Sequence, residues 1–161
     1  MLRPSNFIQN LETVLAPRVR HHDEISVPAG RGRSAFIDVD DIGAATAHVL
    51  TTPGHIGAGH DLTGPEALDF AAVAAALTGA LGRPIRYHPV NPAAFILREF
   101  RAGSPVPLPL VMTALYTAQR LGKAEAVTDT LPRLLGRPAG TLQAYVTRSA
   151  AIWAPARPGG P

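Results

Sequence analysis

The 161-residue sequence has no cysteine, and Lys123 is the only lysine among its 15 basic residues. Without cysteine the chain has no disulfide framework, no thiolate nucleophile and no cysteine-based zinc site. No apolar run approaches the ~20 residues that a membrane-spanning helix requires. The N-terminus lacks an uninterrupted apolar segment behind a basic start, so it does not resemble a signal peptide. We therefore expect a cytoplasmic protein that does not bind a membrane.

The sequence also has little excess charge, since its net charge is only +3. Aromatic residues make up only 6% of the chain. The arginines are spread along the sequence instead of being clustered. Proteins that bind single-stranded nucleic acid combine a basic groove with aromatic stacking platforms. We therefore expect no nucleic-acid partner.

Apolar residues account for 46% of the chain and charged residues for 17%, which is typical of a globular protein with a buried core. The length suits one domain. Residues 155–161 are rich in proline and glycine. We therefore predict a single domain over residues 1–154, followed by a disordered tail over residues 155–161.

Short strands alternate with helices along the sequence, which is typical of an α/β domain. Strands are predicted at Leu2 and over residues 25–27, 35–39, 61–63 and 85–90. Helices are predicted over residues 7–15, 42–50, 70–81, 92–100, 110–121, 129–135 and 142–153. The segment after residue 109 is therefore expected to be entirely helical.

Residues with short polar side chains precede most of these helices, where they can cap the free backbone N–H groups. Glycines end three of the helices, because glycine readily adopts the left-handed conformation of a C-cap. The predicted N-caps are Ser5 or Asn6, Asp40 or Asp41, Asp69, Asn91 and Thr141, and the predicted C-terminal glycines are Gly82, Gly122 and Gly136.

A turn over residues 28–33 contains Gly30 and Gly32, the only glycine pair that could form a phosphate-binding loop. Such a loop needs a strand before it and a helix after it, so that backbone N–H groups and the helix dipole face the anion. Here a strand follows the turn. We therefore reject the phosphate loop and predict a hairpin turn.

Three carboxylates, Asp38, Asp40 and Asp41, lie where a strand meets a helix. They could form a general base or a metal site, but capping and the helix dipole account for them. His55 and His60 share a loop, yet zinc sites require further ligands on rigid elements. We therefore interpret the histidines as solvated loop residues and predict no metal.

No catalytic residue can be assigned from a motif. Tyr116 is followed four residues later by Arg120, whereas dehydrogenases of the Tyr-x-x-x-Lys type use a lysine to lower the pKa of the phenol. We therefore interpret Tyr116 as a buried or rim residue of a helix, with catalysis the less favoured alternative.

Short strings spread from Leu2 to about Trp153 occur in a characteristic order. They are Leu2-Arg3-Pro4 with Phe7 and Asn10, Phe36 to Val39 with Asp41-Ile42, Gly57 to Glu66, Gly82 to Ile85, Val127 to Asp129, and Leu135 to Pro138 with the helix start at Thr141. Together they resemble the NmrA-like family of atypical short-chain dehydrogenases. The resemblance implies the C-terminal part of a Rossmann-type doubly wound α/β fold with a mostly helical substrate-side segment.

The resemblance also implies NAD(P) as cofactor. The family holds it on a first βαβ unit with a glycine-rich loop, and no such loop occurs here, so we expect this chain to lack that half. By resemblance, Pro4, Ser5 and Phe7 lie at the nicotinamide, while Asn10 and Phe36 line the substrate pocket. The alternative is that Phe7 belongs to the core and Ser5 only caps a helix.

These observations leave three functional classes open. The first is an NAD(P)H-dependent oxidoreductase acting on a small molecule, inactive or cofactor-free as this chain alone. The second is a non-catalytic NAD(P)-sensing or protein-interaction module. The third is a gene fragment without independent activity. In each case the missing central strands would leave a sheet edge exposed, through which the chain could self-associate.

Overall fold

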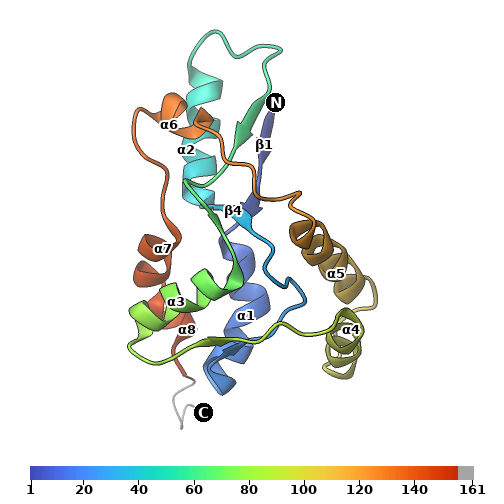
Figure 1. Cartoon of the computed structure of the whole chain (residues 1–161). Coiled ribbons are helices and arrows are strands. Elements are labelled where there is room, and N and C mark those ends of the chain that lie inside the picture. Colours follow the sequence, from blue (N-terminus) through green and yellow to red (C-terminus); the bar gives the residue numbers. More distant parts are fainter. Residues whose placement is uncertain (156–161) are drawn as a thin grey trace.

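Short strands and helices alternate along residues 1–155, the part of the chain that the computed structural model describes (Figure 1). The strands are β1 (Leu2–Pro4), β2 (Asn6–Phe7), β3 (Glu24–Ile25), β4 (Ser34–Ile37), β5 (His60–Leu62), β6 (Ala67–Leu68) and β7 (Arg86–Tyr87). The helices are α1 (Gln9–His22), α2 (Val39–Thr51), α3 (Phe70–Leu81), α4 (Pro92–Arg101), α5 (Pro107–Arg120), α6 (Thr130–Leu135), α7 (Leu142–Arg148) and α8 (Ala150–Trp153). The predicted α/β class is confirmed, and no strand interrupts the described chain after β7.

The strands pair mostly in parallel. β1 pairs with β5, β2 with β4, and β3 with β7, while β6 adds to β4 in the antiparallel direction. Only Ser5 separates β1 from β2, and its backbone N–H donates to the Leu62 carbonyl at 2.8 Å. The first strand segment is therefore bound to β5 at its start and to β4 at its end.

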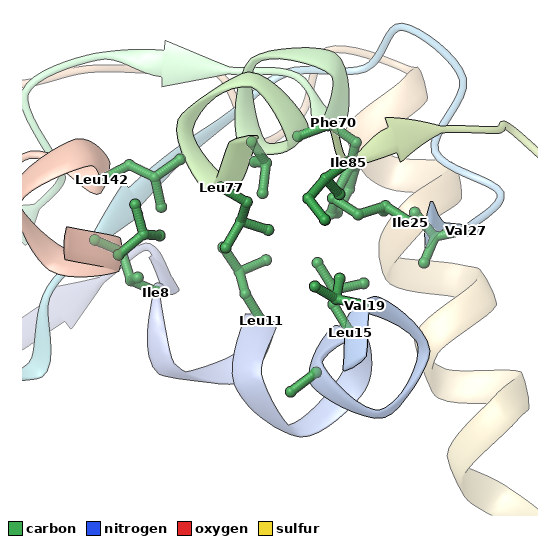
Figure 2. Packing of buried hydrophobic residues seen from close by; sticks show 14 of the residues in the cluster. Ile8, Leu11, Leu15, Val19, Ile25, Val27, Phe70, Leu77, Ile85 and Leu142 are labelled. Carbon is green, nitrogen blue, oxygen red and sulfur yellow. The ribbon is translucent and has the colours of Figure 1, made fainter. Parts of the chain in front are cut away.

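The main core lies between α1 and α3, with α7 and α8 closing it (Figure 2). Leu11, Leu15 and Val19 recur at intervals of four residues, which places them on one face of α1. Phe70 and Leu77 of α3 face this stripe and are almost completely buried. Helical periodicity therefore accounts for the α1 and α3 faces of this core.

A second, smaller cluster packs between α2, α6 and the β1–β5 pair. Its buried members are Ile37, Ala45, Leu62, Leu131 and Ala139. Ile37 belongs to β4 and points away from Phe36, because successive side chains of a strand face opposite sides. One strand thus contributes to both clusters.

Most of the predicted caps are confirmed. Asp69 accepts a hydrogen bond from the Ala72 N–H, Asn91 from the Ala93 N–H and Thr141 from the Ala144 N–H. Gly82 and Gly136 end α3 and α6 in the left-handed conformation, whereas α5 ends at Arg120 with Leu121, not Gly122, as its C-cap. These features depend on residues a few positions apart, which is why the sequence predicts them.

Two other cap predictions are wrong. Neither Ser5 nor Asn6 caps α1, because Asn6 lies in β2 beside Phe36 and the helix begins at Gln9 without a side-chain cap. At α2 the cap is Asp38, not Asp40 or Asp41, since the helix begins at Val39. In the first case a strand pairing from far along the chain keeps the backbone extended, and in the second the helix starts earlier than predicted.

The predicted hairpin around Gly30 and Gly32 is also wrong. β3 and β4 flank the turn but do not pair with each other, because β3 pairs with β7 and β4 with β2 and β6. The turn instead joins two separate sheets. Its glycines serve a contact with α5 that is described below.

Several predicted boundaries shift. The strands predicted over residues 25–27, 35–39 and 85–90 are shorter than predicted, and the strand predicted over residues 61–63 lies one residue earlier. The helix predicted over residues 142–153 is divided into α7 and α8 at Ser149. None of the helices within residues 1–155 is long and apolar enough to cross a membrane. The tail predicted over residues 155–161 lies, apart from Pro155, outside the described residues.

Candidate functional site

A pocket of about 750 Å³ lies between the start of α1 and the helix α5. Residues 3–6, where β1 passes into β2, and the first turns of α1 form one wall, with Asn10, Leu11 and Val14. The opposite wall consists of α5 and the segment after it. The pocket therefore joins parts of the chain that are about a hundred positions apart.

The buried end of this pocket is apolar and aromatic. Phe70 and Tyr116 meet edge to face with ring centroids 5.7 Å apart, and Leu11 lies in the same core cluster. Phe95 supports Tyr116 from behind at 5.8 Å. Burial raises the pKa of Tyr116, so its phenol stays neutral at physiological pH.

The open end of the pocket is charged. Arg3 donates to Asp61 through both Nε and Nη2, at 2.6 and 3.0 Å, and both side chains are about half exposed. Lys123, the single lysine, lines the same rim and is exposed. The pocket thus has an apolar interior and a charged mouth.

The turn with Gly30 and Gly32 positions α5. The Gln119 amide donates to the Gly32 carbonyl at 3.0 Å, and Gln119 is buried. A Cβ atom on Gly32 would lie 2.6 Å from the backbone of Gln119 and Arg120. Glycine is therefore required here because the C-terminal end of α5 packs directly on the turn.

The segment that follows α5 is held along the strands. The Ala35 N–H donates to the Ala124 carbonyl at 2.9 Å, and the Thr128 hydroxyl donates to the Asp61 carbonyl at 2.8 Å. The Thr63 hydroxyl in turn accepts the Thr128 N–H at 2.9 Å. These bonds hold the segment after α5 in place, where Ala124 and Thr128 continue the pocket wall beyond the end of the helix.

The structure brings together three of the five site residues predicted from the sequence. Pro4, Ser5 and Asn10 line the pocket, and the Ser5 hydroxyl donates to the Ala35 carbonyl. Phe7 instead packs against the smaller core cluster, and Phe36 is buried beside Phe70. The binding roles of all five residues remain predictions.

Sequence reasoning missed most of the pocket lining, including Ser34, Tyr116 as a pocket residue, and Gln119. Tyr116 is buried in a helix, as predicted. Ser34 and Gln119 belong to no motif. They line the pocket because the end of α5 packs on the glycine turn just before β4. The double glycine was the one available signal, since it permits close approach by another backbone.

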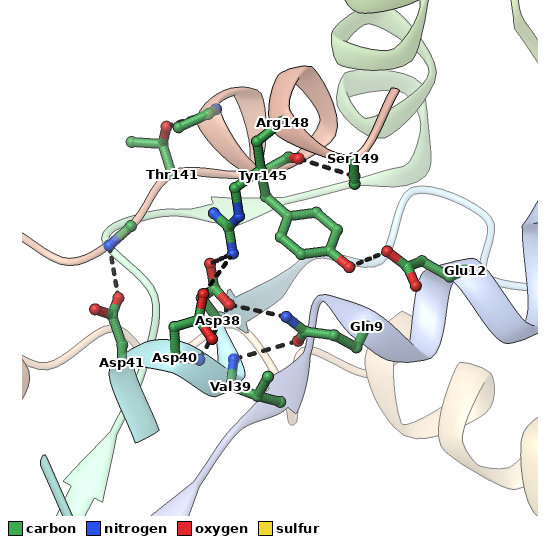
Figure 3. Close-up of polar contacts among 12 residues, drawn as sticks. Gln9, Glu12, Asp38, Val39, Asp40, Asp41, Thr141, Tyr145, Arg148 and Ser149 are labelled. Carbon is green, nitrogen blue, oxygen red and sulfur yellow. Dashed lines mark hydrogen bonds and ion pairs between the residues drawn. The ribbon is translucent and has the colours of Figure 1, made fainter. Parts of the chain in front are cut away.

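The carboxylates at the start of α2 form a polar network that is separate from the pocket (Figure 3). Asp38 accepts hydrogen bonds from Gln9 at 2.8 Å and from Arg148, and Arg148 also binds Asp40 at 3.0 Å. Burial raises the pKa of Asp38, but the hydrogen bonds from Arg148 and Gln9 outweigh it and hold the pKa below its usual value. Tyr145 donates to Glu12 within the same network.

Asp41 is buried and serves a different contact from the predicted capping role. It accepts the Gly140 N–H at 2.7 Å and pairs with Arg137 at 2.7 Å. Together with Asp38 it joins α2 to the segment around α7. The acidic cluster therefore holds helices together.

The loop histidines lie close together without forming a metal site. His55 Nδ1 and His60 Nε2 are 3.2 Å apart, and the ring of His48 lies 5.5 Å from that of His55. Within residues 1–155 no group of three potential ligand side chains has the arrangement that a metal ion needs.

The described residues do not fit the pyrophosphate of a dinucleotide. Such a group needs free backbone N–H groups in a glycine turn ahead of a helix. The turn at Gly30 and Gly32 leads into β4 and is filled by the end of α5. We therefore derive no reaction step through a nicotinamide cofactor from this chain.

Among known proteins, the chain is 36% identical over 152 residues to the NAD(P)H azoreductase of Xenophilus azovorans, covering 94% of this chain and 53% of that protein. It is 30% identical over 154 residues to the uncharacterized oxidoreductase YesF of Bacillus subtilis, covering 95% and 54% of the two chains. The chain thus spans about half the length of these curated relatives. No family model matches it.

Solved structures give the same picture. The NADPH-dependent quinone oxidoreductase of Escherichia coli, in complex with NADPH, superposes with a TM-score of 0.85 at 27% identity over 92% of this chain and 52% of the other. The triphenylmethane reductase of a Citrobacter species superposes with a TM-score of 0.82 at 23% identity, which supports the fold alone. The chain shares its Rossmann-like α/β fold with about half of each NAD(P)-binding reductase.

Proposed function

Because the relatives are NAD(P)-binding oxidoreductases, we propose that this chain supplies the substrate pocket of an NAD(P)H-dependent oxidoreductase of the NmrA-like type. The observation that carries the proposal is the pocket between α1 and α5. It adjoins the end of β1, and open α/β sheets bind their ligands outside the carboxyl ends of strands. Its volume of about 750 Å³ suits a small organic molecule.

The pocket residues would divide the binding between them. Pro4 and Ser5 would meet the nicotinamide end of the cofactor, and Asn10 would contact the substrate. Phe7 packs against the smaller core cluster and Phe36 in the main core, so both would act on binding by holding neighbouring residues of the pocket in place. Residues that this chain does not contain would hold the pyrophosphate.

A chimera tests the proposal. The part of the Xenophilus azoreductase that this chain does not match is joined ahead of Met1, and NADPH oxidation is followed with azo and quinone acceptors. We expect turnover by the chimera. By calorimetry, we expect the chain alone to bind NADH and NADPH no more tightly than about 10 μM, or about 7 kcal/mol.

A matched pair of variants links turnover to the pocket. Ala118 lines the pocket, whereas the neighbouring Thr117 is exposed and does not. Ala118→Trp should fill the pocket and raise KM strongly, while Thr117→Trp should not. Phe7→Ala should weaken ligand binding more than His55→Ala, and equal effects would count against the placement of Phe7.

The outcomes separate the candidate functions. NADPH oxidation with a KM that rises strongly in Ala118→Trp but not in Thr117→Trp supports the oxidoreductase. Binding of NADPH without oxidation, whatever the acceptor, would favour the alternative of a non-catalytic sensor. A chimera that folds cooperatively but binds no NADPH would overturn the proposal.

A further inference from the structure

Ser34 carries a buried hydroxyl without a hydrogen-bond partner, and it is the one such side-chain atom found among residues 1–155. The residue is 1% exposed and lines the pocket between α1 and α5. An unmade hydrogen bond on a buried polar group costs free energy, so each such group needs an explanation. A ligand that completes the bond is one explanation.

The strand geometry shows which way Ser34 faces. Ser34 and Phe36 are two positions apart in β4, so their side chains point to the same side of the sheet. Phe36 packs edge to face against Phe70, with ring centroids 6.2 Å apart. The hydroxyl of Ser34 therefore faces the apolar, buried end of the pocket.

A charged ligand group does not suit this end of the pocket. Leu11, Phe70 and Met112 are apolar lining residues of the pocket. The charged lining residues Arg3 and Asp61 lie at the exposed mouth. A group beside Ser34 should therefore be polar but neutral.

We propose that the Ser34 hydroxyl binds a neutral oxygen of the substrate. The pocket then takes a largely apolar molecule that carries a carbonyl or hydroxyl group at its buried end. A serine hydroxyl can donate and accept, so it serves either oxygen. This inference rests on the proposed function, because it assumes that the pocket between α1 and α5 holds the substrate.

A second buried serine provides a matched control. Ser26 is 3% exposed, and its hydroxyl accepts a hydrogen bond from Arg98 at 2.9 Å. It does not line the pocket. The two serines differ in whether the protein itself satisfies the hydroxyl.

The experiment compares the ketone 1-tetralone with the hydrocarbon tetralin as ligands of the 161-residue chain, titrated without a dinucleotide by nuclear magnetic resonance. Ser34→Ala should weaken binding of tetralone about 3- to 10-fold, the value of one hydrogen bond, and should leave tetralin within about 2-fold. Ser26→Ala should change neither affinity. In the wild type, the Ser34 amide signal should shift more with tetralone than with tetralin.

Thermal unfolding gives a second readout. Ser34→Ala should leave the Tm unchanged or raise it, because it removes an unsatisfied hydroxyl, whereas Ser26→Ala should lower it. Equal loss of both ligands, unchanged tetralone affinity, no binding of either ligand, or a Tm loss as large as that of Ser26→Ala would overturn the inference. These titrations contain no dinucleotide, so the proposed function stands or falls separately by NADPH oxidation in the chimera.

Discussion

The helices α3 and α5 are both rich in apolar residues, but they use them differently. α3 buries Phe70, Val73 and Leu77 against α1 and its neighbours. α5 buries Tyr116 and Gln119 but leaves Leu115 58% exposed, although Leu115 lines the pocket. Apolar side chains therefore fill the core on one side of the molecule and line the pocket on the other.

Truncation of one leucine on each helix should give the largest difference in the free energy of unfolding between α3 and α5. Leu77→Ala removes a fully buried side chain and should lower the free energy of unfolding by about 2–5 kcal/mol. Leu115→Ala should change it by less than about 0.5 kcal/mol but should weaken binding of tetralin. Urea unfolding measures the first effect, and similar losses from the two variants would show that α5 belongs to the core.

The attachment of α5 to the glycine turn should have the next largest effect. Gly32→Ala places a Cβ atom 2.6 Å from the backbone of α5 and should cost about 1–3 kcal/mol by overpacking. It should also abolish ligand binding, because one pocket wall moves. Gly43→Ala is the control: it lies in α2 with nothing within 4 Å, and it should be neutral or stabilising by up to about 1 kcal/mol.

The polar network around Asp38 should contribute a pH-dependent share of stability. Since the pKa of Asp38 is lowered in the folded state, the unfolded chain binds more protons as the pH falls toward the ordinary aspartate value. This stability is fully present above about pH 5 and is lost as the pH drops through the lowered pKa of the folded protein. Unfolding measured between pH 7 and pH 3 checks this decline.

Asp38→Asn should flatten that pH dependence and cost about 1–2 kcal/mol at pH 7, because it weakens a helix cap and leaves Arg148 without its buried partner. Asp61→Asn breaks an exposed ion pair at the pocket mouth and should cost less than about 1 kcal/mol. Equal effects would mean that the buried network adds no more than the surface pair.

A substitution on the exposed face of α5 should reduce self-association and should have the smallest effect on the free energy of unfolding. We expect the chain to be oligomeric by light scattering, since apolar side chains and a strand edge lie open in residues 1–155. Leu110 is 50% exposed and does not line the pocket, so Leu110→Glu should reduce association and change the free energy of unfolding by less than about 0.5 kcal/mol. Association that persists in this variant would implicate the free edge of β1. A monomeric wild-type chain with one cooperative melt above about 55 °C would contradict the expectation.

The sequence predicted the local features of the fold well. Asp69, Asn91 and Thr141 cap helices as expected, because each bonds to a backbone group two or three residues away. It failed where distant partners compete with local preference. Asn6 was expected to cap a helix, but pairing with Phe36 in β4 holds it in a strand.

The site followed the same rule. Pro4, Ser5 and Asn10 could be placed at a pocket from the position of the first strand and the family resemblance. Ser34 and Gln119 could not, since no motif marks them and Gln119 meets the glycine turn from 87 positions away. The glycine pair signalled a close approach without revealing its partner.

The sequence by itself therefore determined the α/β class, the amphipathic helices and most of their ends. Periodicity and capping act over a few residues and leave a readable pattern. Only the tertiary structure decided which strands pair, that Asp38 binds Arg148 across 110 positions, and that Ser34 is left without a partner. Burial and hydrogen-bond satisfaction depend on everything that packs around a group, and no local pattern in the chain records that.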